Sequence, residues 1–455
     1  MSNDAGRMFC ITEFHCLAGA AFQRTFSKTQ RVRAWRSAAA AAAALLGPIA
    51  ALSAQSEPAT PGDPTVAALS KQVAQMEAEI QDLKRQLGAV KTGEATAEAS
   101  EPAPDQSYPR ISFHGFGDVD YQYSSDSKAF PNLFSLGELD FYVTSQISEN
   151  ASILSENVLS ADSTFNNWNL EAERLVFIYK VSPYLNIAAG RFHTEMGYYN
   201  TEFHHGTWLQ MDTHRPWFLE FEDSGGILPV HMVGISLDGD IPSASANLHY
   251  FLQFGNGRSY DAPNSPENPT QADHVDNGRK AVNVEIVSKP KWAPGLQVGA
   301  GYYHQVVSID QTAPGAGPEG FDLIPMASPS ASENIGNVFA VYSAGGWDFL
   351  NEAFLIGHKP TGDVTHHTFA GYTELSKHLG PWTPYARFTY VNSPASDPVY
   401  NLIQTTGLRY GPTLGLRYDF TDFACLKVQY DHNAEYDEQE AAPADEVTFQ
   451  VGFTF

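Results

Sequence analysis

Apolar and polar side chains alternate at every second position from Arg110 onward, a period that predicts β-strands lying between two environments. The first run reads ISFHGFGDVDYQY, in which one set of alternate positions is small or apolar and the other mostly polar. The last run, 447–455, alternates Val and Phe with Thr, Gln and Gly and ends on Phe455. Further runs lie at 137–147, 300–307, 339–343, 350–357, 385–391 and 408–420. The pattern predicts an all-β domain.

The connections between these strands alternate in length along the chain. Short ones lie at 149–150, 182–184, 239–242, 291–295, 345–346, 379–381 and 421–422. Long ones lie near 125–135, 161–167, 193–227, 257–279, 309–334, 359–364, 393–405 and 436–445. Seven short and eight long connections join sixteen strands. Short turns on one side and long loops on the other are typical of a transmembrane antiparallel β-barrel of the outer membrane, whose short turns face the periplasm.

A different period precedes this domain. Apolar residues at alternating spacings of three and four predict a coiled-coil helix over 66–90, about 38 Å long. Its apolar stripe either pairs with copies of itself or packs against its own domain. Val and Ile at one seam position with Leu at the other favour dimers, a preference that a trimeric body would override. The seam residues of this predicted oligomer stem are Val66, Leu69, Val73, Met76, Ile80, Leu83, Leu87 and Val90.

The N-terminus has the pattern of a targeting segment. Arg31, Arg33 and Arg36 precede an apolar run at 38–52 that ends in small residues, which predicts a signal peptide cleaved near 53–54 and preceded by an upstream extension. A membrane anchor is the alternative, although the run is short for a span. Residues 55–65 then form a flexible lead-in, 91–108 a linker and 109–455 the barrel.

The signal peptide, the coiled coil, the opening strand and the terminal QVGFTF together resemble bacterial outer-membrane porins. The phosphate-selective (O/P-type) superfamily, which includes members with an N-terminal coiled coil, is the nearest in architecture. The resemblance implies a passive diffusion channel for small hydrophilic solutes, often trimeric, in the outer membrane of a Gram-negative-type bacterium. It also implies that the barrel-assembly machinery reads the C-terminal segment, with Phe455 as the assembly signal.

Charge departs from the phosphate-selective pattern. The chain carries a formal charge of −25, which argues against a nucleic-acid partner, and residues 109–455 hold 17 basic and 41 acidic residues. An acidic wall concentrates cations and repels anions, so we expect a cation-preferring or weakly selective channel. Many of these acids can instead simply solvate extracellular loops. The strand parity gives four candidates for the lumen wall: Asp118, Asp120, Glu138 and Asp140.

The third long connection, 193–227, is dense in histidine, aromatic and ionisable residues, and so is expected to be ordered and functional. In porins of this size the third loop commonly folds into the barrel, which predicts a pore constriction here; a packed extracellular lid is the alternative. Its histidines would gain charge near pH 5 and weaken a cation preference. The candidate constriction residues are Arg191, His193, Glu195, Glu202, His204, His205, Asp212, His214 and Arg215.

Motifs for catalysis or cofactor binding are absent from the sequence. The histidine spacing matches no established zinc motif, and neither a nucleophile elbow, a phosphate-binding glycine loop nor His-Glu-x-x-His occurs. No metal site, cofactor or catalytic residue is therefore predicted. Three alternatives to a porin stay open: a structural or adhesive barrel, a barrel that handles divalent metals, and an outer-membrane hydrolase built from isolated residues.

Overall fold

The computed structural model describes residues 108–125, 132–162, 167–203, 207–221, 226–258, 279–308, 330–402, 405–436 and 444–455. All of them lie in one compact unit that spans 45–455. The predicted signal peptide, the lead-in and the coiled-coil stem at 66–90 lie outside the described residues, and they remain predictions. Among the described residues, no helix has both the length and the apolar composition needed to cross a membrane.

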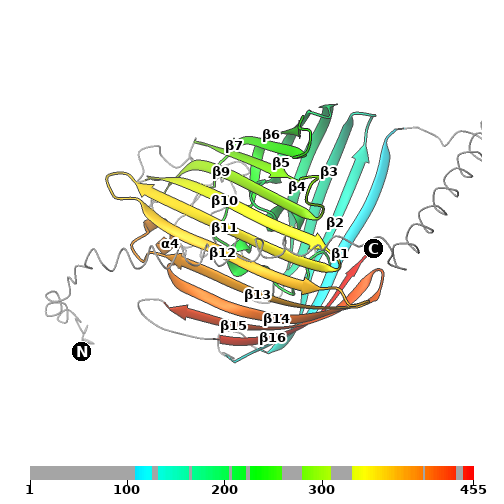
Figure 1. The fold of residues 1–455 in the computed structure, drawn as a ribbon, viewed down its shortest axis with the longest axis vertical. Helices are drawn as coiled ribbons and strands as arrows, with labels where there is room; N and C mark the ends of the chain where they lie inside the picture. The colour runs from blue at the N-terminus through cyan, green and yellow to red at the C-terminus, as the bar shows by residue number, and fades with distance from the viewer. Residues whose placement is uncertain are drawn as a thin grey trace, which may run out of the picture. The chain divides into compact units, whose positions relative to one another are not determined.

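Sixteen antiparallel strands close into a single barrel, as the sequence predicts. Each strand pairs with its neighbours in the chain, and β1 pairs with both β2 and β16 (Figure 1). The strands are β1 (Arg110–Ser124), β2 (Leu133–Gln146), β3 (Ala151–Asp162), β4 (Asn167–Ser182), β5 (Leu185–His193), β6 (His231–Ile241), β7 (Leu248–Asn256), β8 (Lys280–Ser288), β9 (Leu296–Ser308), β10 (Ser330–Ala344), β11 (Trp347–Pro360), β12 (His366–Lys377), β13 (Trp382–Ser393), β14 (Gly407–Thr421), β15 (Ala424–Tyr436) and β16 (Ala444–Thr454).

The alternation read from the sequence separates the two faces of this barrel. On β15, Leu426 and Val428 are 44% and 41% exposed, whereas Lys427 and Gln429, which alternate with them, are 1% and 0% exposed. Apolar side chains therefore face outward and polar ones inward, the reverse of a soluble protein. An apolar outer band around a polar interior is what a barrel needs in order to span a lipid bilayer.

The connections differ from the predicted ones in one turn, in the ends of two long connections and in three short helices. The connections predicted at 309–334 and 125–135 end earlier, because β10 begins at Ser330 and β2 at Leu133. The turn expected at 239–242 lies at 242–247, because Gly239 and Asp240 continue β6 and Asp240 accepts a 2.9 Å hydrogen bond from His249 on β7. Long connections contain α3 (Tyr199–Glu202), the 3₁₀ helix η2 (Trp217–Leu219) and α4 (Pro398–Leu402). These helices span only three to five residues, which is too short for a helical period to show in the sequence.

The C-terminal residue completes the seam at which the barrel closes. Phe455 and Gly115 exchange two backbone hydrogen bonds of 3.0 Å, and the Phe455 ring occupies the space that a Cβ atom of Gly115 would need. The ring is 55% exposed and lies beside Phe113 on β1. Phe455 therefore contributes both to the closure of the barrel and to its apolar outer surface.

We therefore expect Phe455→Asp to reduce the amount of folded barrel in cells. The change places a carboxylate on the lipid-facing side of the closing seam, where charge is disfavoured. Comparison of the heat-modifiable folded band on gels with that of the wild type measures the loss. Phe420→Asp is the matched control, because Phe420 on β14 is 45% exposed but lies away from the seam. Equal folding of the two variants would argue against a special role for the terminal residue.

Candidate functional site: the loop inside the barrel

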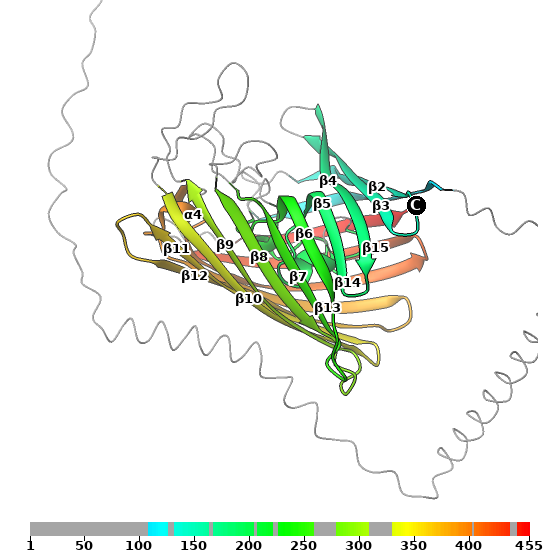
Figure 2. The same cartoon turned by 90° about the horizontal axis from the view of Figure 1, so that it is seen from above.

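The connection between β5 and β6 lies within the barrel. We call residues 194–230 the inner loop; 194–203, 207–221 and 226–230 of it are described. Arg417 on β14 donates hydrogen bonds of 2.8 Å to the carbonyls of Trp208 and Gln210. Lys427 on β15 donates to the carbonyl of Asp212 at 2.8 Å. Because β14 and β15 are far from β5 and β6 in the order of the barrel, the loop crosses the interior to reach them (Figure 2).

One ion pair ties the middle of the inner loop to this wall. Asp212, which is 1% exposed, pairs with Arg387 of β13 and accepts a 2.8 Å hydrogen bond from the Tyr199 hydroxyl. Arg387 also donates to the carbonyl of His214 at 2.9 Å. Burial raises the pKa of Tyr199, so its hydroxyl stays a donor. A buried pair with these extra hydrogen bonds is expensive to break from one side.

A carboxylate on the wall holds the start of the inner loop. Glu352 of β11 accepts the backbone N–H groups of Tyr198 and Tyr199 at 2.9 and 2.7 Å, together with the Tyr372 hydroxyl at 2.7 Å. Gly197 has φ +76°, and a Cβ atom there would meet Glu352. The close approach of backbone to carboxylate therefore requires glycine at this position.

Arg215 organises the inside of the loop rather than its surface. Its guanidinium donates to the carbonyls of Phe203 and Leu219 at 2.9 and 2.6 Å and to Asn200. The same group lies 5.1 Å from the ring centroid of Tyr199. Arg215 is 4% exposed, and burial lowers its pKa. Its guanidinium is therefore enclosed by the loop rather than presented to the barrel interior.

An apolar cluster fills the space between the inner loop and the wall. Met196, Phe218 and Leu228 of the loop are fully buried there, against inward side chains such as Phe354 of β11. The connection between β13 and β14 also contacts the inner loop, since Tyr400 of α4 donates a hydrogen bond of 3.2 Å to the carbonyl of Ile227. The loop is thus packed, with a core of its own.

The α4 segment is fixed by a buried polar network on β10 and β11. His358 contacts Asp397 at 2.7 Å through Nδ1 and Glu333 at 3.0 Å through Nε2. Glu333 also pairs with Arg258, and Arg258 donates to the Ile227 carbonyl at 3.0 Å. The end of the inner loop and α4 are therefore held by one connected set of ionisable groups.

The predicted constriction residues occupy different environments. Arg191 and His193 belong to the end of β5 rather than to the loop, and His193 is 5% exposed and 3.6 Å from Glu156. Glu202 is exposed, whereas the side chain of His214 is 38% exposed. Asp212 and Arg215 are the buried anchors described above. His204 and His205 lie outside the described residues.

The four predicted lumen-wall acids have the expected inward parity. Asp118 and Asp140 are 5% and 0% exposed, and Asp120 and Glu138 are half-buried. Asp118 accepts the backbone N–H of Glu138 at 3.3 Å, across a β-bulge between β1 and β2. Their role in a pore stays a prediction.

The residues that hold the inner loop in place do not stand out in the sequence. Arg387, Arg417, Lys427 and Glu352 lie at alternate positions of strands, facing inward. Strand parity alone could have placed them in the lumen. Nothing in the pattern shows that their partners are in a loop more than 150 residues away.

A cavity of about 150 Å³ lies between the inner loop and strands β3 to β7. Its lining combines apolar side chains, including Val176 and Phe192, with the charged groups Arg174, Glu195 and Asp238. Gln253 of β7 positions Glu195 by accepting its backbone N–H at 2.9 Å. Burial raises the pKa of Glu195 to about 7, against the pull of Arg174, so this carboxyl changes charge near neutral pH.

Comparison with known proteins identifies the fold. No protein-family model and no curated protein matches the sequence. Solved structures do match in fold. One is an anion-selective porin from Comamonas acidovorans, with a TM-score of 0.52 and 11% identity over 76% of this chain and 100% of that chain. A second is Salmonella typhi OmpF in complex with daunomycin, with a TM-score of 0.51 and 11% identity over 76% of this chain and 98% of that chain. A third is the trimer form of OmpT, an outer-membrane protein of Vibrio cholerae, with a TM-score of 0.51 and 10% identity over 77% of this chain and 100% of that chain. The chain therefore has the sixteen-stranded barrel fold found in outer-membrane porins.

Proposed function

We propose that this protein is an outer-membrane porin for passive diffusion of small hydrophilic solutes, with the inner loop as its constriction. The observation that carries the proposal is the path of that loop. It leaves the wall at β5, crosses the interior and binds Arg387, Arg417 and Lys427 on the far strands. On this proposal, the loop and its packed core narrow the passage through the barrel.

The charge distribution supports a cation-preferring or weakly selective pore. Residues 109–455 carry a net charge of −24 by their basic and acidic residues. The basic groups Arg387, Arg417 and Lys427 each bind the inner loop, which reduces their effect on a solute in transit. Acidic groups such as Asp120 and Glu138 remain partly exposed on the inward face. The Comamonas neighbour is called anion-selective, and we expect this chain to differ from it.

Oligomer state and location complete the proposal. A homotrimer in the outer membrane is favoured by the family resemblance and by the trimer form of the OmpT neighbour. The predicted stem would then lie in the periplasm. Its contribution to assembly, like that of the barrel-assembly machinery, is proposed from the sequence alone.

Planar-bilayer recording tests both the pore and its selectivity. In a tenfold KCl gradient we expect unit conductance steps and a reversal potential of the sign given by preferential K⁺ permeation. Glu138→Gln and Asp120→Asn should each move that potential toward zero, because each removes a negative charge from the lumen wall. Absence of unit steps would contradict a porin, and an anion-type reversal potential would contradict only the selectivity.

A further inference from the structure

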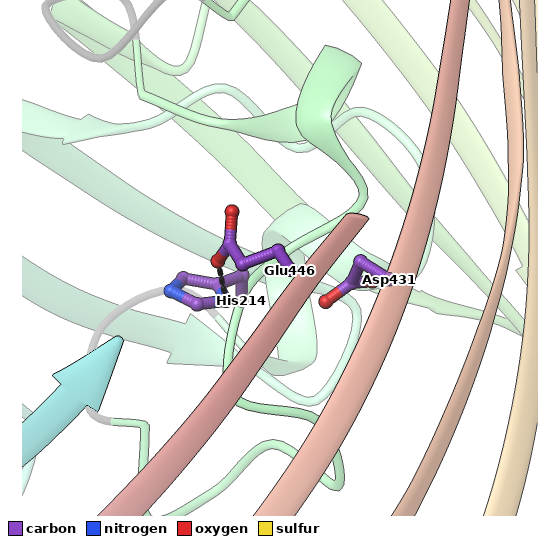
Figure 3. A group of neighbouring side chains, drawn as sticks. All are labelled: His214, Asp431 and Glu446. Atoms are coloured by element: carbon purple, nitrogen blue, oxygen red, sulfur yellow. Dashed lines mark ion pairs between the residues drawn. The ribbon is translucent and has the colours of Figure 1, made fainter. Parts of the chain in front are cut away.

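Three side chains of the kind that bind metal ions converge where the inner loop meets the barrel wall. They are His214 of the loop, Asp431 of β15 and Glu446 of β16 (Figure 3). One ligand atom from each lies within 4.8 Å of the others, and His214 Nδ1 is 4.0 Å from Glu446 Oε1. Figure 3 shows the imidazole beside the Glu446 carboxylate, with Asp431 on the neighbouring strand.

The two carboxylates are direct partners in the register of β15 and β16. Like charges placed opposite each other in a sheet are destabilising unless something neutralises them. Arg387 interacts with Asp431 electrostatically, but its guanidinium is paired with Asp212. Within the described ranges, neither Asp431 nor Glu446 forms an ion pair with a lysine or an arginine; their hydrogen-bond donors are neutral side chains, from Thr413, Gln429, Gln122 and Thr448.

These neutral donors orient the carboxylates without cancelling their charge. Gln429 donates to one oxygen of Asp431 at 2.7 Å, and Thr448 donates to Glu446 at 3.2 Å. Ligands held by an outer set of hydrogen bonds are the usual construction of a protein metal site.

A second observation concerns the negative charge around His214. Gln450 on β16 is 1% exposed and donates to the Thr213 carbonyl, next to His214, at 3.3 Å. Its partner across the strands is Asp120, which interacts electrostatically with His214. In the part of the chain that the structure describes, Gln450 Oε1 and Asp120 Oδ1 are enclosed and accept no hydrogen bond. Gln450 is four residues along β16 from Glu446, so these oxygens border the group rather than belong to it, and Asp120 adds a negative charge beside His214 that favours a cation.

We propose that His214, Asp431 and Glu446 bind a divalent transition-metal ion of the zinc class. Imidazole with carboxylates suits zinc, nickel and iron, whereas calcium and magnesium prefer oxygen ligands alone. In a tetrahedral zinc site, ligand atoms about 2.1 Å from the ion lie about 3.4 Å apart, so side-chain rotations that bring atoms now within 4.8 Å closer together would enclose one ion. The bound ion would link the inner loop to the wall. Such a structural role does not require the barrel to conduct, so this proposal does not depend on the porin proposal.

Zinc binding to the purified full chain in detergent tests this site directly. We expect one tightly bound Zn²⁺ per chain in equilibrium dialysis, not displaced by millimolar Ca²⁺ or Mg²⁺. His214→Asn, Asp431→Asn and Glu446→Gln should each weaken binding by at least about 100-fold, because each removes a ligand. His378→Asn is the matched control: His378 contacts Asp348 at 2.6 Å, in a pair that is not part of the group. Zinc binding that the three changes leave intact, or that the control change abolishes equally, overturns the proposal.

X-ray absorption of zinc-loaded wild type covers the case in which the variants do not fold. One imidazole with oxygen ligands is expected, and a sulfur ligand, which would point to a cysteine such as Cys425, overturns the assignment. Bilayer recording then separates the two proposals. A chain that binds zinc at this site but shows no unit steps refutes the porin alone, and a conducting chain without specific zinc binding refutes the metal site alone.

Discussion

Replacing Asp212 with alanine is expected to free the inner loop and to give larger, noisier conductance steps than the wild type. The change leaves Arg387 buried without its carboxylate, and removal of one partner from a buried ion pair costs about 3–5 kcal/mol. It also removes one of the two acceptors of the Tyr199 hydroxyl, the other being Gln210. Single-channel recording measures the steps, and the temperature at which the folded gel band disappears measures the lost stability.

Two further variants make this result specific. Asp212→Ala combined with Arg387→Met removes both charges, and an apolar replacement of a whole buried pair is often nearly neutral, so much of the stability should return. Glu202→Gln changes an exposed carboxylate of the same loop and should stay within about 0.5 kcal/mol of wild type. If Asp212→Ala conducts like Glu202→Gln, the loop is not held by this pair.

The strand pattern was enough to predict the fold, because every strand of a membrane barrel follows the same alternation of outward and inward side chains. Every strand separates lipid from lumen, so Val428 and Phe449 could be placed outward and Gln429 inward from period two alone. The alternation of short and long connections then gave sixteen strands, which the structure confirms. Errors fell at strand ends, as at 239–242, where a Gly-Asp pair that also suits a turn continues β6 as a paired strand.

The contacts of the inner loop could not be predicted from the sequence pattern, for a physical reason. Charge density marked 193–227 as important, but it did not distinguish Asp212 and Arg215, which are buried anchors, from the exposed Glu202. That distinction depends on partners such as Arg387 and Phe203, and local sequence does not encode which distant groups meet. The metal candidates show the same limit: His214 was noted, whereas Asp431 and Glu446 lie more than 200 residues later.

The predicted histidine effect on selectivity also changes in the light of these environments. His193 is buried at the end of β5 beside Glu156 and Arg174, so it is poorly placed to present charge to the lumen. Glu195, in the same segment, lines the cavity with Arg174 and Asp238. This carboxyl is the better candidate for a charge that responds to pH.

We therefore expect Glu195→Gln to be more stable than the wild type at pH 8 and equally stable at pH 4. Burial raises the pKa of Glu195 to about 7 in the folded chain, from 4.5 when unperturbed. Between these values the folded state binds a proton that the unfolded state has lost, so wild-type stability falls as pH rises through this window. Glutamine stays neutral and has no such slope. Because Glu195 keeps some contact with solvent, we expect a gain of about 2 kcal/mol at pH 8 rather than the full shift.

Denaturant midpoints at pH 4, 6 and 8 measure this difference, and Glu202→Gln, at an exposed site, should follow the wild type throughout. The same ionisation has a consequence for transport. Above pH 7 a negative charge appears beside Arg174 on the lining of the cavity, so the cation-to-anion permeability ratio of the wild type should rise between pH 6 and pH 8. Glu195→Gln should lack that rise. A ratio that rises equally in both proteins would show that other groups set the pH response, even if the stability difference is observed.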